Sequence, residues 1–544
     1  MNLPLGISSL NVEEWSNAHS NFRHTFKKGA SFDLTVSDPA FKAAYPTLKE
    51  QYNKTTANLQ WLIRHAIDHK IRLRAMGSGW SFSKIAVTEG GVVNTKKLRL
   101  KAKLDARHVS QEYLGRGGDP TNLLLAQCGN TIISINDLLE KERNPPKSLR
   151  ASGGSNGQTI VGALSSGTHG AAFKFGALAE FIVGMHLVTG PDRHVWLERK
   201  SNPVTSEEFR GWMNAEVIFD DDLFNSALCS FGSFGFIHSV LVEVEPKFLL
   251  EQELKRIPYN AALEKVIQQG DFSEIAGSLK YPPDTASESL YHFELAINPH
   301  DFEKGSAEKG AYMRVMYKQP FQPGYTPFVP ESKGYTYGDD VLGLIQLMLD
   351  KIELLPGKLE LALVPKAVNA LFKIAYDRPE RAIGTIGETF RNTVFRGKLF
   401  SAAYALDRAD VPRVVNEVLA INRQIPFAGV IAMRFVKGTQ ATLGFTRFPD
   451  TCVLELDGVD ADINHGFADA LTAQLELLNI PYTLHWGKVN DVLNPQRVRT
   501  MYGNARVDTW LRHRRQLLSA EAREVFCNGF MERCGLHQKE EVIV

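Results

Sequence analysis

Residues 76–83 read MGSGWSFS, a glycine-rich turn directly after the run IRLRA at residues 71–75, which is typical of a β-strand. A second cluster of small residues, GGSNGQTIVGALSSGTHG, spans residues 153–170. Glycine gives up more conformational freedom on folding than any other residue, so this density requires compensation. Backbone N–H groups gathered by glycine turns bind anions, and Ser and Thr hydroxyls add donors. Two such clusters favour a diphosphate ligand.

The common nucleotide-binding motifs are missing from both clusters. The sequence has no GxxxxGK[ST] motif, and neither cluster shows GxGxxG at the start of a helix with an acidic residue about twenty positions later. A P-loop NTPase and a standard Rossmann dehydrogenase are therefore disfavoured. Ordinary surface turns remain the alternative for each cluster alone, because Gly and Ser also collect in turns.

Composition narrows the class of protein. A chain of 544 residues is expected to form two or more domains. Its 62 basic and 61 acidic side chains nearly cancel, which indicates no nucleic-acid or anionic-membrane partner. Five scattered cysteines show no metal-ligand spacing, so we expect no metal and a reducing, cytoplasmic location. We find no signal-peptide pattern at the N-terminus and no uninterrupted apolar run that would span a membrane.

The order of predicted elements indicates an α+β protein in three parts. A helix over residues 56–70 precedes the strand and the first glycine turn, and a second helix is expected over 134–143 with Ser134 or Asn136 near its N-cap. Strands are expected within 123–131, 234–248, 291–300, 430–438 and 451–459, and a helix over 411–424. We place domains at 1–250 and 251–480, with 481–544 returning to the first.

A leucine-rich segment over residues 341–375 is interrupted by Pro356 and Pro365. Apolar residues at helical spacing indicate helices packed in a core or at a subunit interface. The alternative is an apolar substrate entrance or a membrane-surface contact.

Four motifs in order carry a resemblance to a known family: GSGWSFS, then GGSNGQTIVGALSSGTHG, then FGSFGFIHSVLVEV at 231–244, and LHWGKVNDV at 484–492 with the tail FCNGFMERCGL. Together they resemble the vanillyl-alcohol oxidase and p-cresol methylhydroxylase family of flavoproteins, in particular its aldonolactone oxidase and alditol oxidase branch. The resemblance implies an FAD-binding domain built from the N-terminal half and the C-terminal tail, with an α+β cap domain between them.

The resemblance also implies which residues bind FAD. The first cluster would wrap the diphosphate through Gly77, Ser78, Gly79, Ser81 and Phe82. The second cluster would line the diphosphate and the flavin through Ser155, Thr159, Gly162, Ser165, Ser166, Gly167, Thr168, His169 and Gly170. Gly235 and Ile237 would meet the adenosine end.

Trp80 departs from the family pattern. Many members carry a histidine there, in GSGHS, and join it covalently to the flavin. Because indole is not an equivalent nucleophile, we predict noncovalent FAD with Trp80 packed against the ring. The alternative is that Trp80 is only part of the core.

The catalytic candidates lie in the C-terminal half. Lys488 in HWGK is expected to stabilise the negative charge that develops near flavin N1 and the C2 oxygen. His485 would hydrogen-bond the ring or orient Lys488, unless it is an ordinary core histidine. The aldonolactone branch has a Glu-x-Arg strand facing the flavin, and the matching stretch here, VIAMRF at 430–435, keeps Arg434 but has Ala432 in place of the acid.

Glu294, on the expected strand HFELAINP, is the candidate general base. If it lines the cavity, burial is expected to raise its pKa toward that of a base that accepts an alcohol proton. A surface or salt-bridged carboxylate is the alternative.

These candidates predict an FAD-dependent oxidoreductase that oxidises a CH–OH group of a small alcohol or lactone by hydride transfer to flavin N5, with oxygen or another acceptor reoxidising the flavin. The loss of the acid at 432 makes a sugar lactone doubtful. One alternative is an oxidase of a bulky apolar, steroid-like alcohol, favoured by Ala432 and the leucine-rich segment. The other is a non-catalytic FAD-binding relative, favoured by the missing histidine and glutamate.

Overall fold

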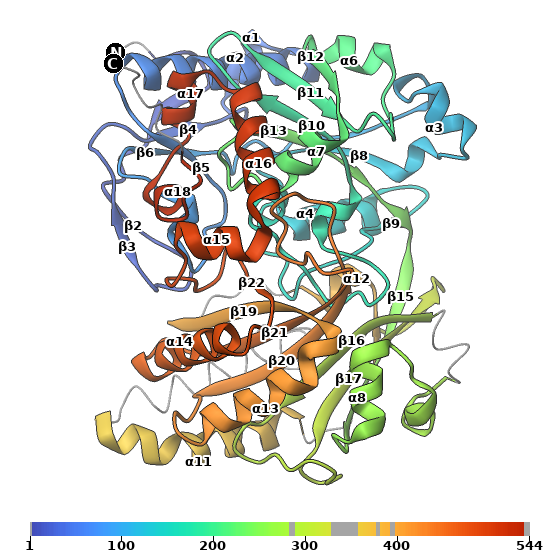
Figure 1. Ribbon diagram of the computed structural model, residues 1–544. Coiled ribbons are helices and arrows are strands. Elements are labelled where there is room, and N and C mark those ends of the chain that lie inside the picture. The colour runs from blue at the N-terminus through green and yellow to red at the C-terminus, as the bar shows by residue number, and fades with distance from the viewer. Residues whose placement is uncertain (1–2, 282–288, 328–356, 377–380, 392–397, 538–544) are drawn as a thin grey trace.

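The computed structural model describes residues 3–281, 289–327, 357–376, 381–391 and 398–537. The chain forms two parts that lie one above the other in Figure 1. The upper part is built from the N-terminal half, and the lower part is a single large sheet with its helices. The C-terminal helices, red in Figure 1, pack on the upper part.

The upper part contains two larger sheets, two small two-stranded sheets (β2 with β3, and β9 with β14) and a long helix. One sheet has the order β1 (Ile7–Ser9), β4 (Phe32–Leu34), β6 (Gly91–Asn94) and β5 (Leu73–Met76). The other has the order β12 (Glu216–Phe219), β11 (His194–Glu198), β10 (Ile182–Val188), β13 (Phe236–Glu243), β8 (Leu123–Gln127) and β7 (Lys101–Lys103). Helix α2 (Leu48–Asp68) begins at a capping box, in which the Thr47 hydroxyl accepts from the Glu50 N–H and the Glu50 carboxylate accepts from the Thr47 N–H.

Shorter elements join these sheets. They are β2 (Glu14–Ser16), β3 (Arg23–Thr25), α1 (Pro39–Ala44), α3 (Gln111–Gly115), α4 (Ile132–Asp137), β9 (Lys147–Ser148), α5 (Ile160–Ser166), α6 (Glu207–Met213), α7 (Asp221–Leu228) and β14 (Glu245–Pro246). Helix α5 lies inside the second glycine cluster and ends at Gly167, whose φ of +83° suits glycine.

The lower part is an eight-stranded sheet. Its order is β18 (Arg381–Gly384), β15 (Phe248–Ile257), β17 (Ala311–Pro320), β16 (Leu290–Ile297), β20 (Gly429–Lys437), β21 (Asp450–Val459), β19 (Leu399–Asp407) and β22 (Tyr482–Leu484). Its helices are α8 (Ala261–Gln269), α11 (Gly357–Tyr376), α12 (Ile386–Thr389), α13 (Val411–Asn422) and α14 (Asp462–Leu477). Consecutive side chains of a strand point to opposite faces, so Val430, Ala432 and Arg434 share one face of β20.

Helix α11 contains the described part of the leucine-rich segment. Its residues Val364, Val368, Leu371 and Phe372 form an apolar cluster with Val430 and other residues on that same face of the sheet. This packing confirms the core interpretation for residues 357–376, whereas residues 341–356 lie outside the described part of the chain. Pro365 does not break the helix, contrary to the expectation, because it lies inside α11.

The other predicted elements differ from the structure mainly at their ends. The strands expected from the sequence are present as β8, β13, β16, β20 and β21, and the predicted helix at 411–424 is α13. Helix α4 starts earlier than predicted, because its N-cap is Thr131, whose hydroxyl accepts from the Ser134 N–H. The boundary placed near residue 250 falls within β15. Strand β22 joins the lower sheet, although it lies in the segment assigned to the return.

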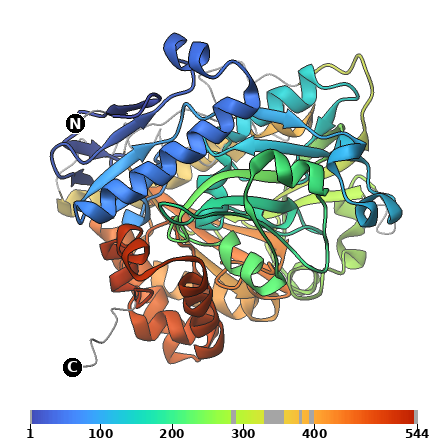
Figure 2. The same ribbon diagram turned by 90° about the horizontal axis from the view of Figure 1, so that it is seen from above.

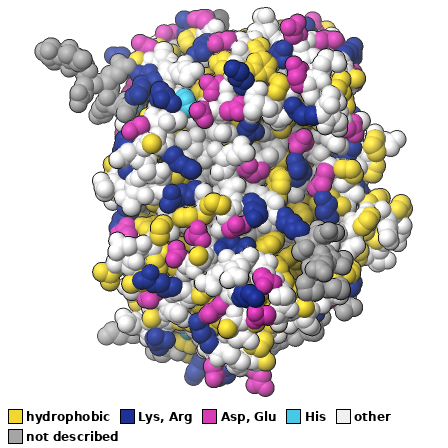
Figure 3. Space-filling view, turned by 45° about the vertical axis from the view of Figure 1, so that its right-hand side comes forward, with side chains coloured by type: hydrophobic (Ala, Val, Ile, Leu, Met, Phe, Trp, Pro, Cys, Tyr) yellow, Lys and Arg dark blue, Asp and Glu magenta, His cyan; other side chains and the backbone are white. Residues whose placement is uncertain are grey.

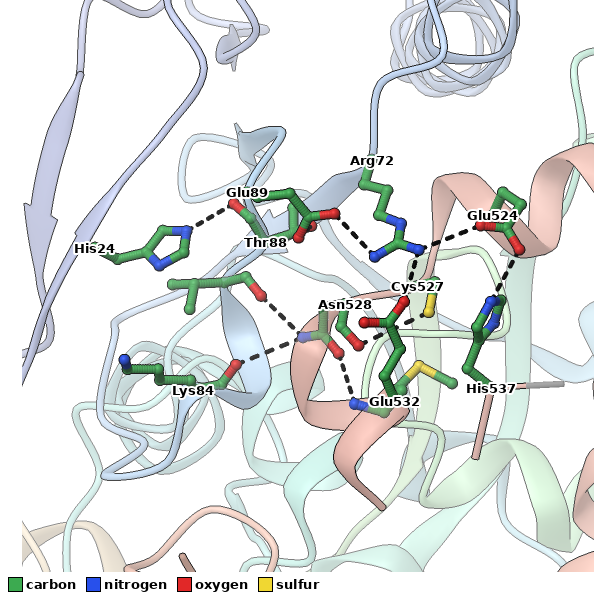
Figure 4. Close-up of polar contacts among 12 residues, drawn as sticks. His24, Arg72, Lys84, Thr88, Glu89, Glu524, Cys527, Asn528, Glu532 and His537 are labelled. Carbon is green, nitrogen blue, oxygen red and sulfur yellow. Dashed lines mark hydrogen bonds and ion pairs between the residues drawn. The ribbon is translucent and has the colours of Figure 1, made fainter. Parts of the chain in front are cut away.

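The return consists of α15 (Pro495–Tyr502), α16 (Asn504–Leu517), α17 (Ala520–Val525) and α18 (Gly529–Arg533), which lie beside the N-terminal elements in Figures 1 and 2. Arg72, next to β5, donates to Glu89 and Glu532 at 2.8 Å and to Glu524 at 3.3 Å (Figure 4). The fully buried Asn528 donates to the carbonyls of Ile85 at 3.0 Å and Val87 at 2.9 Å. These bonds fix the tail to the upper part.

Cys527, Glu532 and His537 lie close enough together for a metal ion to be considered. The Arg72 guanidinium already pairs with the Glu532 carboxylate, and Arg74 and Arg514 act electrostatically on the Cys527 thiol as well. This concentration of positive charge opposes a cation, so we assign the cluster a structural role. All five cysteines are free thiols.

The face shown in Figure 3 carries basic and acidic side chains interspersed with apolar ones. Among the described helices, none combines the length and the hydropathy needed to cross a bilayer.

Candidate active site

Both glycine clusters and the segment 485–488 line one cavity of about 270 Å³. Most of the predicted cofactor and catalytic residues line it: Gly77, Ser78, Gly79, Trp80, Ser81, Phe82, Ser155, Thr159, Gly162, Ser165, Ser166, Thr168, His169, Gly235, Ile237, Arg434, His485 and Lys488. Three predicted residues do not line it: Gly167, Gly170 and Glu294. The clusters, which are far apart in the sequence, are therefore brought together as expected.

The two clusters pack against each other through glycine. A Cβ atom at Gly157 would lie 2.4 Å from Cζ2 of Trp80, and one at Gly77 would lie 2.5 Å from Oγ1 of Thr159. Trp80 also contacts the His19 ring edge-on, with ring centroids 5.6 Å apart. The indole thus fills the space that the missing Gly157 side chain leaves, which explains a large ring in a turn of small residues.

The walls of this cavity suit a dinucleotide. Gly79 and Gly235 have φ values of +74° and +99°, which L side chains rarely adopt. Among the described residues, Arg74, Gln158 and Ser165 line the cavity and carry buried polar atoms without a hydrogen-bond partner. Arg74 is 1% exposed, and burial lowers the pKa of its guanidinium to about 9. A phosphate-bearing ligand would satisfy the donors of Arg74 and Ser165, whereas the Gln158 atom is its Oε1 acceptor.

The Lys488 segment is bonded directly to the first glycine cluster. The Phe82 N–H donates to the Gly487 carbonyl at 2.8 Å, and the Ser83 hydroxyl donates to the Trp486 carbonyl at 2.6 Å. These bonds hold Lys488 at the edge of the cavity next to the glycine turn.

His485 shapes this segment from within. Its Nδ1 accepts from the Gly487 N–H at 3.0 Å, and its carbonyl accepts from the Lys488 N–H at 3.2 Å. Burial lowers the pKa of its imidazole well below the usual value, so the ring is neutral. His485 therefore orients the backbone that carries Lys488.

Glu455 on β21 supplies a carboxylate next to Arg434. It stands directly opposite Ala432 in the β20–β21 ladder, lines the cavity and is 1% exposed. Its carboxylate pairs with Arg434 Nε at 3.0 Å and with the Lys488 ammonium. Burial raises its pKa, but Arg434 and Lys488 outweigh this effect and lower it to about 2. The acid missing from position 432 is thus present on the neighbouring strand.

Asp457 lies two residues further along β21 and also lines the cavity. The Ser401 hydroxyl of β19 donates to its Oδ1 at 2.5 Å, and Lys488 Nζ lies 3.8 Å from the same oxygen. Burial and the charge of Glu455 raise its pKa, although Lys488 opposes them.

Glu294 is paired behind the cavity. Its carboxylate lies 3.1 Å from Arg434 Nε, 3.4 Å from Arg314 Nη1 and 3.4 Å from His292 Nε2. Burial alone would raise its pKa, as expected from the sequence, but the two guanidiniums lower it below the ordinary range. The predicted raised pKa is therefore wrong, and the salt-bridged alternative describes this residue.

Several cavity residues were missed by the sequence reasoning: His19, Arg74, Ser401, Glu455 and Asp457. The alternation in VLELDG marks Glu455 and Asp457 as sharing one face of a strand. That signal does not give the neighbouring strands, because the order of an eight-stranded sheet is set by long-range pairing.

Residues 52–197 match the family model described as FAD binding domain. This part of the chain is similar to FAD-binding domains. Together with the relatives below, the match confirms the resemblance to the vanillyl-alcohol oxidase and p-cresol methylhydroxylase family, and FAD as the cofactor. Noncovalent attachment remains a prediction.

Curated proteins of similar sequence are lactone oxidoreductases. The chain is 25% identical over 289 residues to an L-gulono-1,4-lactone dehydrogenase of Mycobacterium tuberculosis. The aligned stretch covers 53% of each of the two chains. It is 26% identical over 190 residues to a D-arabinono-1,4-lactone oxidase of Candida glabrata, covering 35% of this chain and 30% of that one. The chain thus spans about half the length, or less, of these relatives.

Solved structures extend the likeness to the whole fold. A cholesterol oxidase from Brevibacterium sterolicum superposes with a TM-score of 0.66 at 16% identity, over 98% of both chains. A cholesterol oxidase described as solvent-stable gives a TM-score of 0.63 at 15% identity, over 98% of this chain and 99% of that one. At these identities the likeness is one of fold, and it confirms the expected α+β architecture.

Proposed function

We propose that the protein is an FAD-dependent oxidoreductase that oxidises a CH–OH group of a small polar molecule of the aldonolactone or alditol type. The observation that carries this proposal is the cavity shared by two glycine clusters and by Arg434, Glu455, Asp457 and Lys488. Bound FAD would supply the hydride acceptor. The lactone oxidoreductases among the relatives support the substrate class.

The side chains around the cavity would divide the work. Lys488 and Arg434 would provide fixed positive charge for the anionic reduced flavin, and Glu455 would hold both cations in place. His485 would position Lys488 through the backbone bonds described above. Trp80 would form an aromatic wall for noncovalent FAD.

The charged lining favours a polar substrate over a sterol. The cavity lining includes the charged side chains of Arg434, Glu455, Asp457 and Lys488 and the Ser401 hydroxyl. Burying these groups against a hydrocarbon skeleton would leave them without water. The resemblance to cholesterol oxidases concerns the fold. Glu455 also removes the main objection to a sugar lactone, which was the missing acid at 432.

Anaerobic reduction of the FAD-loaded protein tests the proposal. L-gulono-1,4-lactone, D-sorbitol and cholesterol would be added separately while the flavin absorbance near 450 nm is followed. We expect bleaching by the lactone or the polyol and none by cholesterol. If dithionite-reduced protein passes electrons to oxygen or dyes but no compound bleaches the flavin, the proposed reaction is wrong. If it passes no electrons either, the non-catalytic alternative is favoured.

The electron acceptor and the cellular location are also part of the proposal. We infer that oxygen or another small acceptor reoxidises the flavin, as in the oxidases and dehydrogenases among the relatives. The five free thiols support a reducing compartment such as the cytoplasm.

A further inference from the structure

Two carboxylates stand side by side on the cavity face of β21. Glu455 and Asp457 are two residues apart, so both point to the same side of the strand, and both line the cavity. Glu455 stands between Ala403 of β19 and Ala432 of β20, whereas Asp457 stands between Ser401 and Val430. None of these four paired residues is acidic, so at these two positions of the β19–β21–β20 ladders the acidic groups are Glu455 and Asp457.

The partners of the two carboxylates differ. Glu455 is paired with two cations, Arg434 and Lys488, and His169 Nε2 lies 3.7 Å from its Oε1. Asp457 has the Ser401 hydroxyl as a hydrogen-bond donor and Lys488 at 3.8 Å. The charge of Glu455 is thus compensated by two cations. The cation near Asp457 is Lys488, which already pairs with Glu455.

Charged groups reach Asp457 from several elements. Glu455 acts from its own strand, Arg434 from β20 and Lys488 from the segment 485–488, while β19 contributes the neutral Ser401. Burial and Glu455 raise the pKa of Asp457, and Lys488, Ser401 and Arg434 oppose this rise. Environments that push two neighbouring pKa values apart commonly separate a fixed charge from a proton-transfer group.

We propose that Asp457 is the group that accepts the proton of the substrate hydroxyl, and that Glu455 is the positioning residue that holds Arg434 and Lys488 as cations. This inference rests on the proposed function. The O–H bond of the substrate breaks and its proton passes to the Asp457 carboxylate, while the C–H bond breaks and its electron pair leaves as hydride to FAD. The carbon is oxidised to a carbonyl and FAD is reduced. Glu294 does not compete for this role, because its carboxylate is paired outside the cavity.

The first test is the pH dependence of flavin reduction by L-gulono-1,4-lactone or D-sorbitol. In D457N the rate should fall by about 10²- to 10⁴-fold, the range for loss of a general base, and its dependence on the ionisation of this group should vanish. D450N is the matched control, because Asp450 begins the same strand but is half exposed and paired with Lys437. It should leave the rate and the profile unchanged.

Two further variants should move the profile in opposite directions. E455Q removes a like charge and frees Lys488 to pair with Asp457, so the apparent pKa of the rate should fall. S401A removes a donor that stabilises the ionised carboxylate, so the apparent pKa should rise. A merely structural role for Asp457 predicts no such opposed shifts, and their absence overturns the proposal even if D457N fails to fold.

A substrate-free titration separates this inference from the proposed function. Infrared difference spectra of the FAD-loaded protein between acidic and neutral pH should contain a protonated-carboxyl band that D457N lacks and D450N keeps. If wild-type flavin is not reduced by either probe, the proposed function fails and the proton transfer fails with it. If the flavin is reduced but D457N keeps both the band and the wild-type rate profile, the proposed function stands and the assignment of Asp457 is overturned.

Discussion

Lys488 is the residue on which most of the proposed chemistry depends. Its ammonium pairs with Glu455 and lies 3.8 Å from Asp457, and its backbone is held by His485 and by the first glycine cluster. A cation fixed in this way does not need to reorganise when negative charge develops on the flavin, which is the condition for effective electrostatic stabilisation.

Replacing this cation should slow the reaction without releasing the cofactor. In K488M we expect the rate of flavin reduction by L-gulono-1,4-lactone to fall about 10²- to 10³-fold, because one preorganised charge is lost. Stopped-flow absorbance measures the rate, and the flavin spectrum reports retained FAD. The double variant K488M/E455Q removes both charges of the pair and controls for the loss of one of the two cations that pair with Glu455. An undiminished rate in K488M would contradict the assigned role.

Glu294 is expected to contribute to the stability of the fold. It pairs with two buried guanidiniums, so E294Q leaves both Arg314 and Arg434 with less compensation. We expect a loss of about 3 kcal/mol or more in the free energy of unfolding, the usual cost of breaking a buried pair. D450N breaks an exposed pair and should cost less than about 1 kcal/mol. Urea unfolding of the two variants measures the difference, and equal losses would contradict this account.

The glycine residues of the site were predictable from sequence, whereas its carboxylates were not. The glycine-rich composition of residues 76–83 and 153–170 is enough to predict that the backbone there comes close to a ligand or to another segment. The acid that the resemblance places at position 432 is replaced by Ala432, and the carboxylate of Glu455 stands opposite it on the paired strand β21. Alternation within one strand cannot reveal which residue of another strand stands opposite.

At the scale of elements, the two glycine loops act as one binding unit because they interlock. Gly157 has no room for a side chain beside Trp80, so the turn at 77–82 and the loop before α5 can approach only with glycine at this position. The indole that breaks the family pattern thereby joins the two halves of the predicted cofactor site.

This interlock predicts a steric effect and its relief. G157A should weaken FAD binding, because the added methyl group would lie 2.4 Å from Trp80 Cζ2 and one loop must move. The second substitution in G157A/W80H replaces the indole by a smaller ring and should restore part of the affinity. G211A adds a methyl group into open space on α6 and should leave affinity unchanged. Fluorescence titration with FAD measures all three, and equal affinities would contradict the interlock.

Helix positions were predicted better than helix ends. The apolar spacing of residues 56–70 and 411–424 correctly indicated α2 and α13. The cap of α4 was misplaced because Thr131, Ser134 and Asn136 are all good capping residues, and the side-chain bond to the Ser134 N–H decides between them. Pro365 lies within α11, where packing of the helix against the sheet outweighs the local cost of proline.

At the scale of the whole molecule, the upper and lower parts meet at the cavity. The first glycine cluster and the tail belong to the upper part, and β19, β20 and β21 bring Ser401, Arg434, Glu455 and Asp457 from the lower sheet. The resemblance implies a two-part organisation, and the domain bounds stay a prediction. The entry of β22 into the lower sheet was not predicted, because three residues carry too little pattern to indicate a pairing partner.

Buried histidines make the whole fold sensitive to acid. Burial lowers the pKa of His238 to about 3 and that of His186 well below its usual value. His186 Nδ1 is hydrogen-bonded to the Tyr52 hydroxyl at 2.7 Å, and the His238 ring stacks on the Tyr52 ring. When the pH falls below the ordinary histidine pKa, these two histidines bind protons in the unfolded chain but stay neutral in the folded chain. Stability is therefore full above about pH 6.5 and falls as the pH drops toward the lowered folded values.

The expected size is about 1.4 kcal/mol of unfolding free energy lost per such histidine on going from about pH 7.5 to about pH 5.5. Urea unfolding at the two pH values measures the loss, and H238Q should reduce it by the share of one histidine. His24 lies at a partly exposed site outside this cluster, where its Nε2–H donates to the Thr88 carbonyl at 2.7 Å, so H24Q serves as the control. A stability that is equal at both pH values would contradict this explanation.

The central claim is that two distant glycine clusters hold one FAD molecule whose ring faces Lys488. The most direct measurement is the flavin spectrum of the purified protein, before and after acid precipitation and after titration with FAD. We predict a yellow protein, or a colourless one that binds FAD at one site per chain, with the flavin released into the supernatant by acid. Flavin that stays in the pellet would contradict noncovalent attachment, and a colourless protein that binds no FAD would contradict the claim itself.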